Sequence, residues 1–329
     1  MTDYSAPAWL PGGHLQTIWS ARWSRRFETN APHWRRERWI TPDDDFVDVD
    51  FCEATPPHSK RPLLVLFHGL EGSSGSHYSQ AFADWGLQNG CDIAVPHFRG
   101  CSGTLNLAPR AYHSGDHEEV DHLLRKFKGI VDAQSRPGLL AAGVSLGGNA
   151  LMRWAGEHGQ SAQKVVNAVA SICSPLDLTA SGHAIGKGFN RQVYTRMFLR
   201  SMKPKAMAKL KQFPGLFDAN KLMAAQDLYA FDDVFTAPLH GFKNTDDYWL
   251  RASALQHMGN IALPALALNA QNDPFIPSSS LPFSEKVSAH VTLWQPDEGG
   301  HVGFASGSWP GHLKAMPEAV GQWLLQHIH

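Results

Sequence analysis

The sequence predicts an α/β fold in which helices flank a mostly parallel central sheet and a helical lid is inserted. Two observations lead to this prediction. From residue 62 onward, short apolar runs alternate with helical patterns, as in parallel sheets that are covered on both faces. This alternation stops near residue 175 and resumes near residue 256. We therefore expect a core of residues 1–174 and 256–329, with an N-terminal arm over 1–37, and a lid over 175–255.

The first half of the chain contains most of the expected core elements. The arm is rich in Trp, Pro and Arg and is expected to be irregular, and the hairpin after it turns at residues 43–45. Apolar runs then indicate strands, and apolar residues at helical spacing indicate helices. Strands are expected at 38–41, 46–52, 62–67, 91–96, 139–144 and 165–171, and helices near 78–85, 116–133 and 147–158.

The second half begins with the lid and ends with the last core elements. Residues 175–255 show helical patterns broken by glycine and proline, for example at 213–215, and no clear buried strand. After the lid we expect strands at 263–270 and 290–294, a helix at 280–287 between them, and a closing helix with one apolar face over 316–328.

The composition argues against several classes of protein. The 329 residues carry a net charge of −1, which gives no indication of a nucleic-acid partner. The four cysteines are widely spaced, so we expect reduced thiols and a cytoplasmic location rather than a disulfide framework. The N-terminal residues lack the pattern of a signal peptide, and no apolar run is long enough to span a bilayer.

The sharpest motif is the G-x-S-x-G sequence at residues 143–147, between an expected strand and an expected helix. A serine hydroxyl is a weak nucleophile until a base takes its proton, so it must project from a tight turn that a histidine can reach. Glycines two residues to either side relieve crowding in this turn, and the following helix points its partial positive charge at the site. We therefore predict that Ser145 is a catalytic nucleophile.

A second motif, at residues 67–72, directly follows an expected strand. Acyl transfer places negative charge on a carbonyl oxygen, and two backbone N–H groups should meet it, one of them from the residue after the nucleophile. We assign these donors to Leu146 and Leu70, and we expect His68 and Gly69 to contact the substrate. The alternative for this motif is an ordinary glycine turn.

The acid and the base are predicted from chain order, because in this type of site the serine precedes the acid and the acid precedes the histidine. Asp273 follows the first strand after the lid, and His301 follows the last strand, so both lie at the carboxyl ends of strands, where such sheets bind ligands. Asp273 would hold the tautomer of His301, which would take the proton of Ser145. Asp177 is the alternative acid and His312 the alternative base.

This chemistry needs neither a metal nor an organic cofactor. The acidic triplet at 43–45 is a candidate metal site, but we favour a solvated turn. We interpret Cys101 as a buried small residue rather than a reactive thiol. Four further residues are equally compatible with lining a pocket or with glycine-rich turns: Arg99, Gly100, Tyr112 and His113.

Longer strings extend beyond these motifs. They are Gly-Gly-His-Leu-Gln-Thr at 12–17, His-Gly-Leu-Glu-Gly at 68–72, Phe-Arg-Gly-Cys-Ser-Gly at 98–103, Tyr-His-Ser-Gly-Asp at 112–116, Gly-Val-Ser-Leu-Gly-Gly-Asn at 143–149 and Asn-Asp-Pro-Phe at 272–275. Through these strings the chain resembles the YheT-type branch of the α/β-hydrolases over about residues 8–325.

The resemblance implies an α/β-hydrolase fold and an esterase activity, with eukaryotic relatives that act on medium-chain acyl esters and phospholipids. The family triad maps onto Ser145, Asp273 and His301. The family often has an acidic pair before the proline, where this chain has Asn272 and Asp273, so the acid next to the proline is retained. We derive no role for His14 in the first string and favour a packed or hydrogen-bonded structural histidine.

We expect hydrolysis of a small-molecule carboxylic ester with a short- to medium-chain acyl group, through an acyl-serine intermediate. One alternative is an acyltransferase that passes the same acyl group to an alcohol. Another is a non-catalytic binding module on the same fold. Peptidase and thioesterase activities also stay open, because the triad does not select the leaving group.

The lid contains a cationic stretch. Residues 178–217 hold eight Lys and Arg side chains and no Asp or Glu. A cationic amphipathic helix can lie on an anionic lipid surface or receive an anionic substrate. We favour a helix that packs on the core with its basic face in solvent. Five apolar residues fall on one helical stripe of this stretch: Phe189, Val193, Tyr194, Met197 and Phe198.

Overall fold

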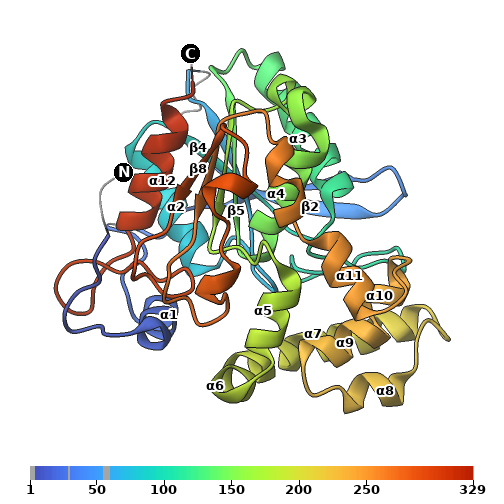
Figure 1. The fold of residues 1–329 in the computed structure, drawn as a ribbon. Coiled ribbons are helices and arrows are strands. Elements are labelled where there is room, and N and C mark those ends of the chain that lie inside the picture. The colour runs from blue at the N-terminus through green and yellow to red at the C-terminus, as the bar shows by residue number, and fades with distance from the viewer. Residues whose placement is uncertain (1–3, 29, 55–59, 329) are drawn as a thin grey trace.

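An eight-stranded sheet forms the centre of the part of the chain that the computed structural model describes, residues 4–28, 30–54 and 60–328 (Figure 1). Its strand order is β1-β2-β4-β3-β5-β6-β7-β8. Strand β2 is antiparallel to both of its neighbours, and all the other pairs are parallel, as predicted. The strands are β1 (Arg35–Ile40), β2 (Phe46–Cys52), β3 (Leu63–Phe67), β4 (Asp92–Pro96), β5 (Leu139–Val144), β6 (Ala168–Ile172), β7 (Ala265–Leu268) and β8 (Val291–Trp294).

Helices cover both faces of the sheet (Figure 1). Leu64 and Leu66 of β3 pack toward α2 and α12, whereas Val65 and Phe67 pack toward α3 and α4. A strand that is buried on both faces needs an uninterrupted apolar run, which is why such runs identified these strands in the sequence. The four helices are α2 (His77–Gln88), α12 (Ala315–Leu325), α3 (His117–Ala133) and α4 (Leu146–His158).

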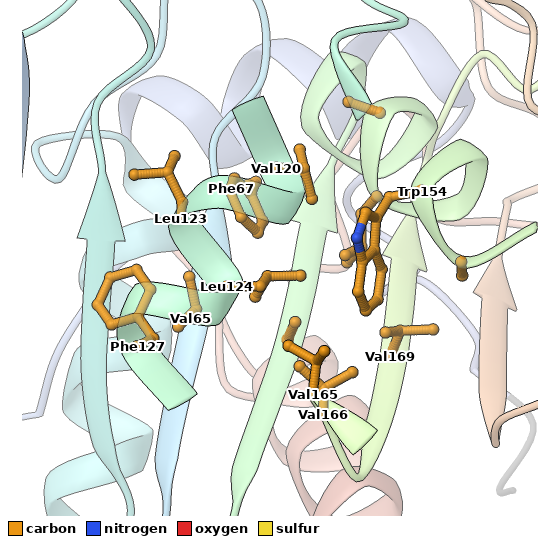
Figure 2. Close-up of a cluster of buried hydrophobic side chains, with 14 of the residues drawn as sticks. Val65, Phe67, Val120, Leu123, Leu124, Phe127, Trp154, Val165, Val166 and Val169 are labelled. Atoms are coloured by element: carbon orange, nitrogen blue, oxygen red, sulfur yellow. The ribbon is translucent and has the colours of Figure 1, made fainter. Parts of the chain in front are cut away.

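Figure 2 shows the buried cluster between the sheet and α3 and α4. Phe127 of α3 lies at one side of this view, and its ring centroid is 4.7 Å from that of Trp39 on β1. Trp154 of α4 lies at the other side, and its indole N–H donates to Asp121 Oδ1 at 3.0 Å. The two helices are thereby fixed against the strands that end at the candidate site.

The stretch between β6 and β7 is helical, and it lies below the carboxyl ends of the parallel strands in Figure 1. It has its own apolar cluster, which includes Leu199, Phe231 and Phe235. Its elements are α5 (Leu178–Ile185), α6 (Gly188–Asn190), the π-helical turn η2 (Arg191–Thr195), α7 (Arg196–Gln212), α8 (Ala219–Ala224), α9 (Leu228–Val234), α10 (Thr236–Leu239) and α11 (Thr245–Ala252). We call this stretch, residues 175–255, the helical segment.

The N-terminal arm is not irregular throughout, which corrects one expectation. Helix α1 (Gly13–Arg22) occupies its middle, while the first three residues of the arm lie outside the described residues. The buried side chains of α1 are Gln16, Thr17 and Ser20. Because this buried face is polar, a search for apolar periodicity does not find the helix.

The helix expected at 280–287 is also wrong. Two short 3₁₀ turns stand there instead, η4 (Ser278–Ser280) and η5 (Ser284–Lys286). Pro282 lies between them, and proline interrupts a helix because it has no N–H to donate and crowds the preceding turn. Two other 3₁₀ helices, η1 (Gly159–Lys164) and η3 (Leu255–Asn260), extend the connections around α4 and β7.

The four cysteines are free thiols; Cys52, Cys91 and Cys173 are buried, whereas Cys101, which we expected to be buried, is half-buried. Burial raises the pKa of the Cys101 thiol to about 11, so this group stays protonated at neutral pH. Among the helices of the described residues, none combines the length and the apolar composition that crossing a membrane would require.

Replacing Phe127 with alanine tests the packing in Figure 2. The ring is fully buried, so its removal should lower the free energy of unfolding by about 3–5 kcal/mol. Phe283→Ala is the matched control, because that ring is 52% exposed and its loss should change stability by less than about 0.5 kcal/mol. Denaturant unfolding measures both values, and equal losses would contradict the packing described.

Candidate active site

Ser145 lies in a sharp turn between β5 and α4. Its backbone has φ 53° and ψ −120°, a strained conformation for a residue with a side chain. A Cβ atom on Gly143 would lie 2.5 Å from Gly147 O, and one on Gly147 would lie 2.5 Å from His68 O. Both glycines of the motif are therefore required by close backbone contacts, and the turn holds the Ser145 hydroxyl clear of the sheet.

His301 lies between the predicted nucleophile and the predicted acid. Its Nε2 is 3.0 Å from Ser145 Oγ, and its Nδ1 is 2.8 Å from Asp273 Oδ2. The Asp273 side chain is fully buried, and its other oxygen accepts the N–H of Phe275 at 2.8 Å. The Phe275 ring stacks on the imidazole. In this arrangement Nδ1–H donates to the carboxylate, and Nε2 is free to accept the serine proton.

The alternative acid and base lie in other surroundings. Asp177 caps α5, because its carboxylate accepts the N–H of Ala180 at 3.0 Å. His312 contacts the hydroxyl of Ser306 at 3.2 Å. Of the candidate pairs, the structure therefore brings only Asp273 and His301 together with Ser145 in the described part of the chain.

The two backbone amides predicted to receive an oxyanion lie on either side of the nucleophile. Leu146 is the first residue of α4, so its N–H precedes the first hydrogen bond within the helix. Leu70 follows β3 in a loop that packs on the turn, since a Cβ on Gly69 would lie 3.2 Å from Ser145 Cβ. Both residues line the same cavity as Ser145. Their role as donors stays a prediction.

Two tyrosines fix the loop around Leu70; the sequence left the role of Tyr112 open and gave Tyr78 no role beyond its helix. Tyr78 Oη accepts the N–H of Gly69 at 2.8 Å, and Tyr112 Oη accepts the N–H of Glu71 at 3.0 Å. Burial raises the pKa of Tyr112 well above its usual range, so the hydroxyl keeps its proton and donates to the Glu71 carboxylate. The amide of Leu70 is thus held between two anchored neighbours.

His68 and Gly69 lie in structural surroundings, and the expectation that they contact the substrate stays a prediction. His68 is fully buried, its Nε2 accepts the N–H of Phe98 at 3.0 Å, and its Nδ1 donates to Gly69 O at 2.7 Å. Burial lowers its pKa to about 3, so the imidazole is neutral. The amide of Gly69 is taken by Tyr78, and neither residue lines the cavity. The string has a structural role at these two positions.

A cavity lies between the sheet and the helical segment. Its volume is about 160 Å³, far more than the roughly 10–15 Å³ that one water needs. Burial raises the pKa of Asp232 in its wall to about 6 and lowers the pKa of Lys209 to about 8. Its lining includes Ser145, His301, Leu70, Leu146, Leu178, Ile185, Phe198, Phe231, Phe235, Trp249 and Phe275, together with the four residues whose placement the sequence left open, Arg99, Gly100, Tyr112 and His113.

The cationic stretch is largely integrated into the fold. Val193, Tyr194 and Phe198 pack in a cluster with Phe275, as a helix packed on the core would require. Phe189 and the remaining stripe residue, Met197, are exposed. His14 joins α1 to this stretch through a 3.0 Å hydrogen bond between its Nδ1 and Tyr194 Oη, in line with the structural role that we favoured.

The acidic triplet forms a turn that is only partly solvated, because its first two residues are exposed whereas the third, Asp45, is buried. Asp45 is fully buried, and both it and Asp43 form ion pairs with Arg99. Asp45 also accepts hydrogen bonds from Asn106 and from the N–H of Leu107. These contacts anchor the loop that lines one wall of the cavity. Among the described residues, no group of three or more potential ligands is arranged to hold a metal ion.

Comparison with known proteins now identifies the family. A family model described as "alpha/beta hydrolase fold" matches residues 62–308. The chain belongs to the α/β-hydrolase family. YheT of Escherichia coli, which is named as a candidate esterase, is 34% identical over 96% of this chain and 91% of its own length. Human phospholipase ABHD3 is 27% identical over 99% of this chain and 80% of its own.

Further relatives of this α/β-hydrolase agree with that assignment. A monoacylglycerol lipase of Saccharomyces cerevisiae is 25% identical over 82% of this chain and 59% of its own. Among solved structures, an esterase of Pyrococcus furiosus has a TM-score of 0.58 at 16% identity, covering 93% of this chain and 98% of that one, which supports the fold. The chain therefore falls within a group of carboxylic ester hydrolases.

Exchanging each candidate acid for asparagine separates their roles. Asp273→Asn should lower kcat by about 10⁴-fold, because the amide favours the wrong tautomer of His301. Asp177→Asn should leave kcat within about twofold, because asparagine is as good a helix cap as aspartate. Ester hydrolysis assays measure both, and a large loss in Asp177→Asn with little loss in Asp273→Asn would exchange the assignments.

Proposed function

We propose that this α/β-hydrolase cleaves a carboxylic ester through an acyl intermediate on Ser145. The observation that carries this proposal is the 3.0 Å separation between Ser145 Oγ and His301 Nε2, with Asp273 behind the imidazole. A base within hydrogen-bond reach of a hydroxyl, itself oriented by a carboxylate, is the arrangement that activates a serine.

The acylation half of the reaction follows from this geometry. His301 takes the hydroxyl proton as Oγ attacks the ester carbonyl, and the C=O electron pair moves onto oxygen. The N–H groups of Leu70 and Leu146 would stabilise that oxyanion, each by about 3 kcal/mol. When the tetrahedral intermediate collapses, His301 passes its proton to the leaving alcohol, and the acyl group stays on Ser145.

Deacylation repeats these steps with water. His301 takes a proton from water as the water oxygen adds to the acyl carbonyl. When the intermediate collapses, His301 returns that proton to Ser145 Oγ, which releases the carboxylic acid and restores the free serine. Asp273 keeps its negative charge and stabilises the imidazolium in both halves. Every proton transfer uses a side chain of the triad, so no cofactor takes part in these steps.

The apolar lining of the cavity favours an ester substrate with an apolar acyl chain. Its wall near Ser145 is formed by side chains such as Ile185, Phe198 and Phe275. Burying each methylene of an acyl chain there would contribute about 0.8 kcal/mol. Relatives named phospholipase and monoacylglycerol lipase support an acyl ester as the substrate class, and the short to medium chain length is part of our proposal.

Two other functions share this site. An acyltransferase would use the same acyl-enzyme and an alcohol in place of water, and product analysis with added alcohol distinguishes it from a hydrolase. A binding module without catalysis would leave Ser145 unreactive. The proximity of the imidazole to the hydroxyl favours an enzyme over such a module.

Replacing Ser145 with alanine tests the proposal directly. The wild-type protein should hydrolyse p-nitrophenyl esters best at short to medium acyl lengths and should react covalently with a fluorophosphonate. Ser145→Ala should lose the labelling and lower kcat by roughly 10⁴-fold or more, because no hydroxyl remains to be activated. Ser161→Ala, at an exposed serine, is the matched control and should keep both. Labelling that persists in Ser145→Ala would rule out this nucleophile.

A further inference from the structure

We propose that helix α1 positions the catalytic histidine through the side chains of Gln16 and Thr17. The inference rests on the proposed function, because it assigns these residues an effect on the rate at which His301 acts. It gives a role to the string at residues 12–17, which the sequence singled out and the triad does not use.

Three consecutive backbone amides lead into the imidazole, and each one donates to a side chain. The N–H of Gly299 donates to Gln16 Oε1 at 2.9 Å, and the N–H of Gly300 donates to Asn272 Oδ1 at 2.9 Å. The N–H of His301 itself donates to Thr17 Oγ1 at 2.8 Å. The turn that presents the base is therefore held from outside, in addition to its own backbone hydrogen bonds from Gly303 and Phe304 to Gly299 O.

Gln16 connects the loop of the base to the loop of the acid. Its Oε1 also accepts Asn272 Nδ2 at 2.9 Å, and Asn272 directly precedes Asp273. Its Nε2 donates to Leu10 O at 3.1 Å and to Glu298 Oε1 at 3.3 Å. With two donors at its oxygen and two acceptors at its nitrogen, the fully buried amide has only one orientation that satisfies both ends.

Thr17 is fixed in a similar way. Its hydroxyl donates to Gly13 O at 2.7 Å within α1, which leaves its lone pairs directed at the N–H of His301. Both partners of the contact are part-buried, so a side chain of the same shape without a hydroxyl would leave the His301 amide unpaired. Leaving a buried amide unpaired is strongly unfavourable, because the N–H loses the hydrogen bonds that water would have given it.

Glycines allow α1 and the two catalytic loops to touch. A Cβ on Gly13 would lie 1.9 Å from Asn272 O, and one on Gly300 would lie 2.6 Å from Gly13 O. A Cβ on Gly303 would lie 2.7 Å from Gln16 O. The backbone of α1 is thus packed directly against both loops, close enough for a side chain as short as threonine to reach the amide of the base.

Thr17→Val tests this positioning role, with Thr17→Ser as the conservative variant. Valine keeps the shape but removes the acceptor, so the histidine turn should shift, and a displacement of about 1 Å can cost 10²-fold in rate. We expect kcat to fall by about 10- to 100-fold with KM unchanged, since Thr17 is not among the residues that line the cavity. Serine, which keeps the hydroxyl, should restore most of kcat.

The control is Thr245→Val. Thr245 is fully buried, and its hydroxyl donates to a backbone carbonyl, that of Tyr229 at 2.8 Å, but it contacts no residue of the triad. All rates are divided by the active sites counted from the endpoint of fluorophosphonate labelling. A purely structural role would lower the number of active sites in both valine variants and leave kcat per site unchanged. That result would overturn the proposal.

Gln16→Leu gives an independent measurement if Thr17→Val does not fold. It removes the acceptor of the Gly299 amide and should also lower kcat without changing KM. The double variant should lose less than the product of the two single losses, because both act on one turn. If wild-type protein neither reacts with the fluorophosphonate nor hydrolyses esters, the proposed function fails. If it does both but Thr17→Val and Gln16→Leu keep full kcat per site, only the positioning role fails.

Discussion

The imidazole of His301 must contact the Ser145 hydroxyl and the Asp273 carboxylate at the same time. This requirement constrains how the strands and loops around the site are arranged. The three side chains follow β5, β7 and β8, and β5 and β8 are separated by two other strands. At the usual strand spacing, β5 and β8 lie about 14 Å apart. The chain after β8 must therefore turn back across the ends of β6 and β7 to bring His301 within 3.0 Å of Ser145.

The sheet positions Ser145, and the loop after β8 positions His301. Ser145 is held by the turn between β5 and α4, and its N–H donates to Ile172 O at the end of β6, so the rigid core fixes the proposed nucleophile. The loop that carries His301 has no regular strand or helix of its own between β8 and α12. Contacts from α1 and from the loop of Asp273 take the place of that missing secondary structure.

Much of the fold and of the triad could be predicted because both produce local signals. Buried parallel strands require apolar runs, and a strained nucleophile turn requires glycines at fixed positions. The role of His68 could not be read in the same way, because only the structure shows its ring turned inward to the amide of Phe98. Pro282 is a local signal against a helix at 280–287, and its effect on the backbone outweighs the apolar pattern there.

The polar buried face of α1 explains why apolar periodicity does not predict this helix. The same polar face supplies the directional contacts that we propose for the His301 loop. An apolar face would have been visible in the sequence and would have packed without regard to direction, since hydrophobic burial is non-directional. The buried face of α1 is instead made of Gln16, Thr17 and Ser20. The hydrogen bonds of Gln16 and Thr17 contribute only about 1 kcal/mol each but specify angle and distance. The His301 loop must place an imidazole to within a fraction of an ångström. Directional hydrogen bonds can fix such a position, whereas the burial of apolar area alone cannot.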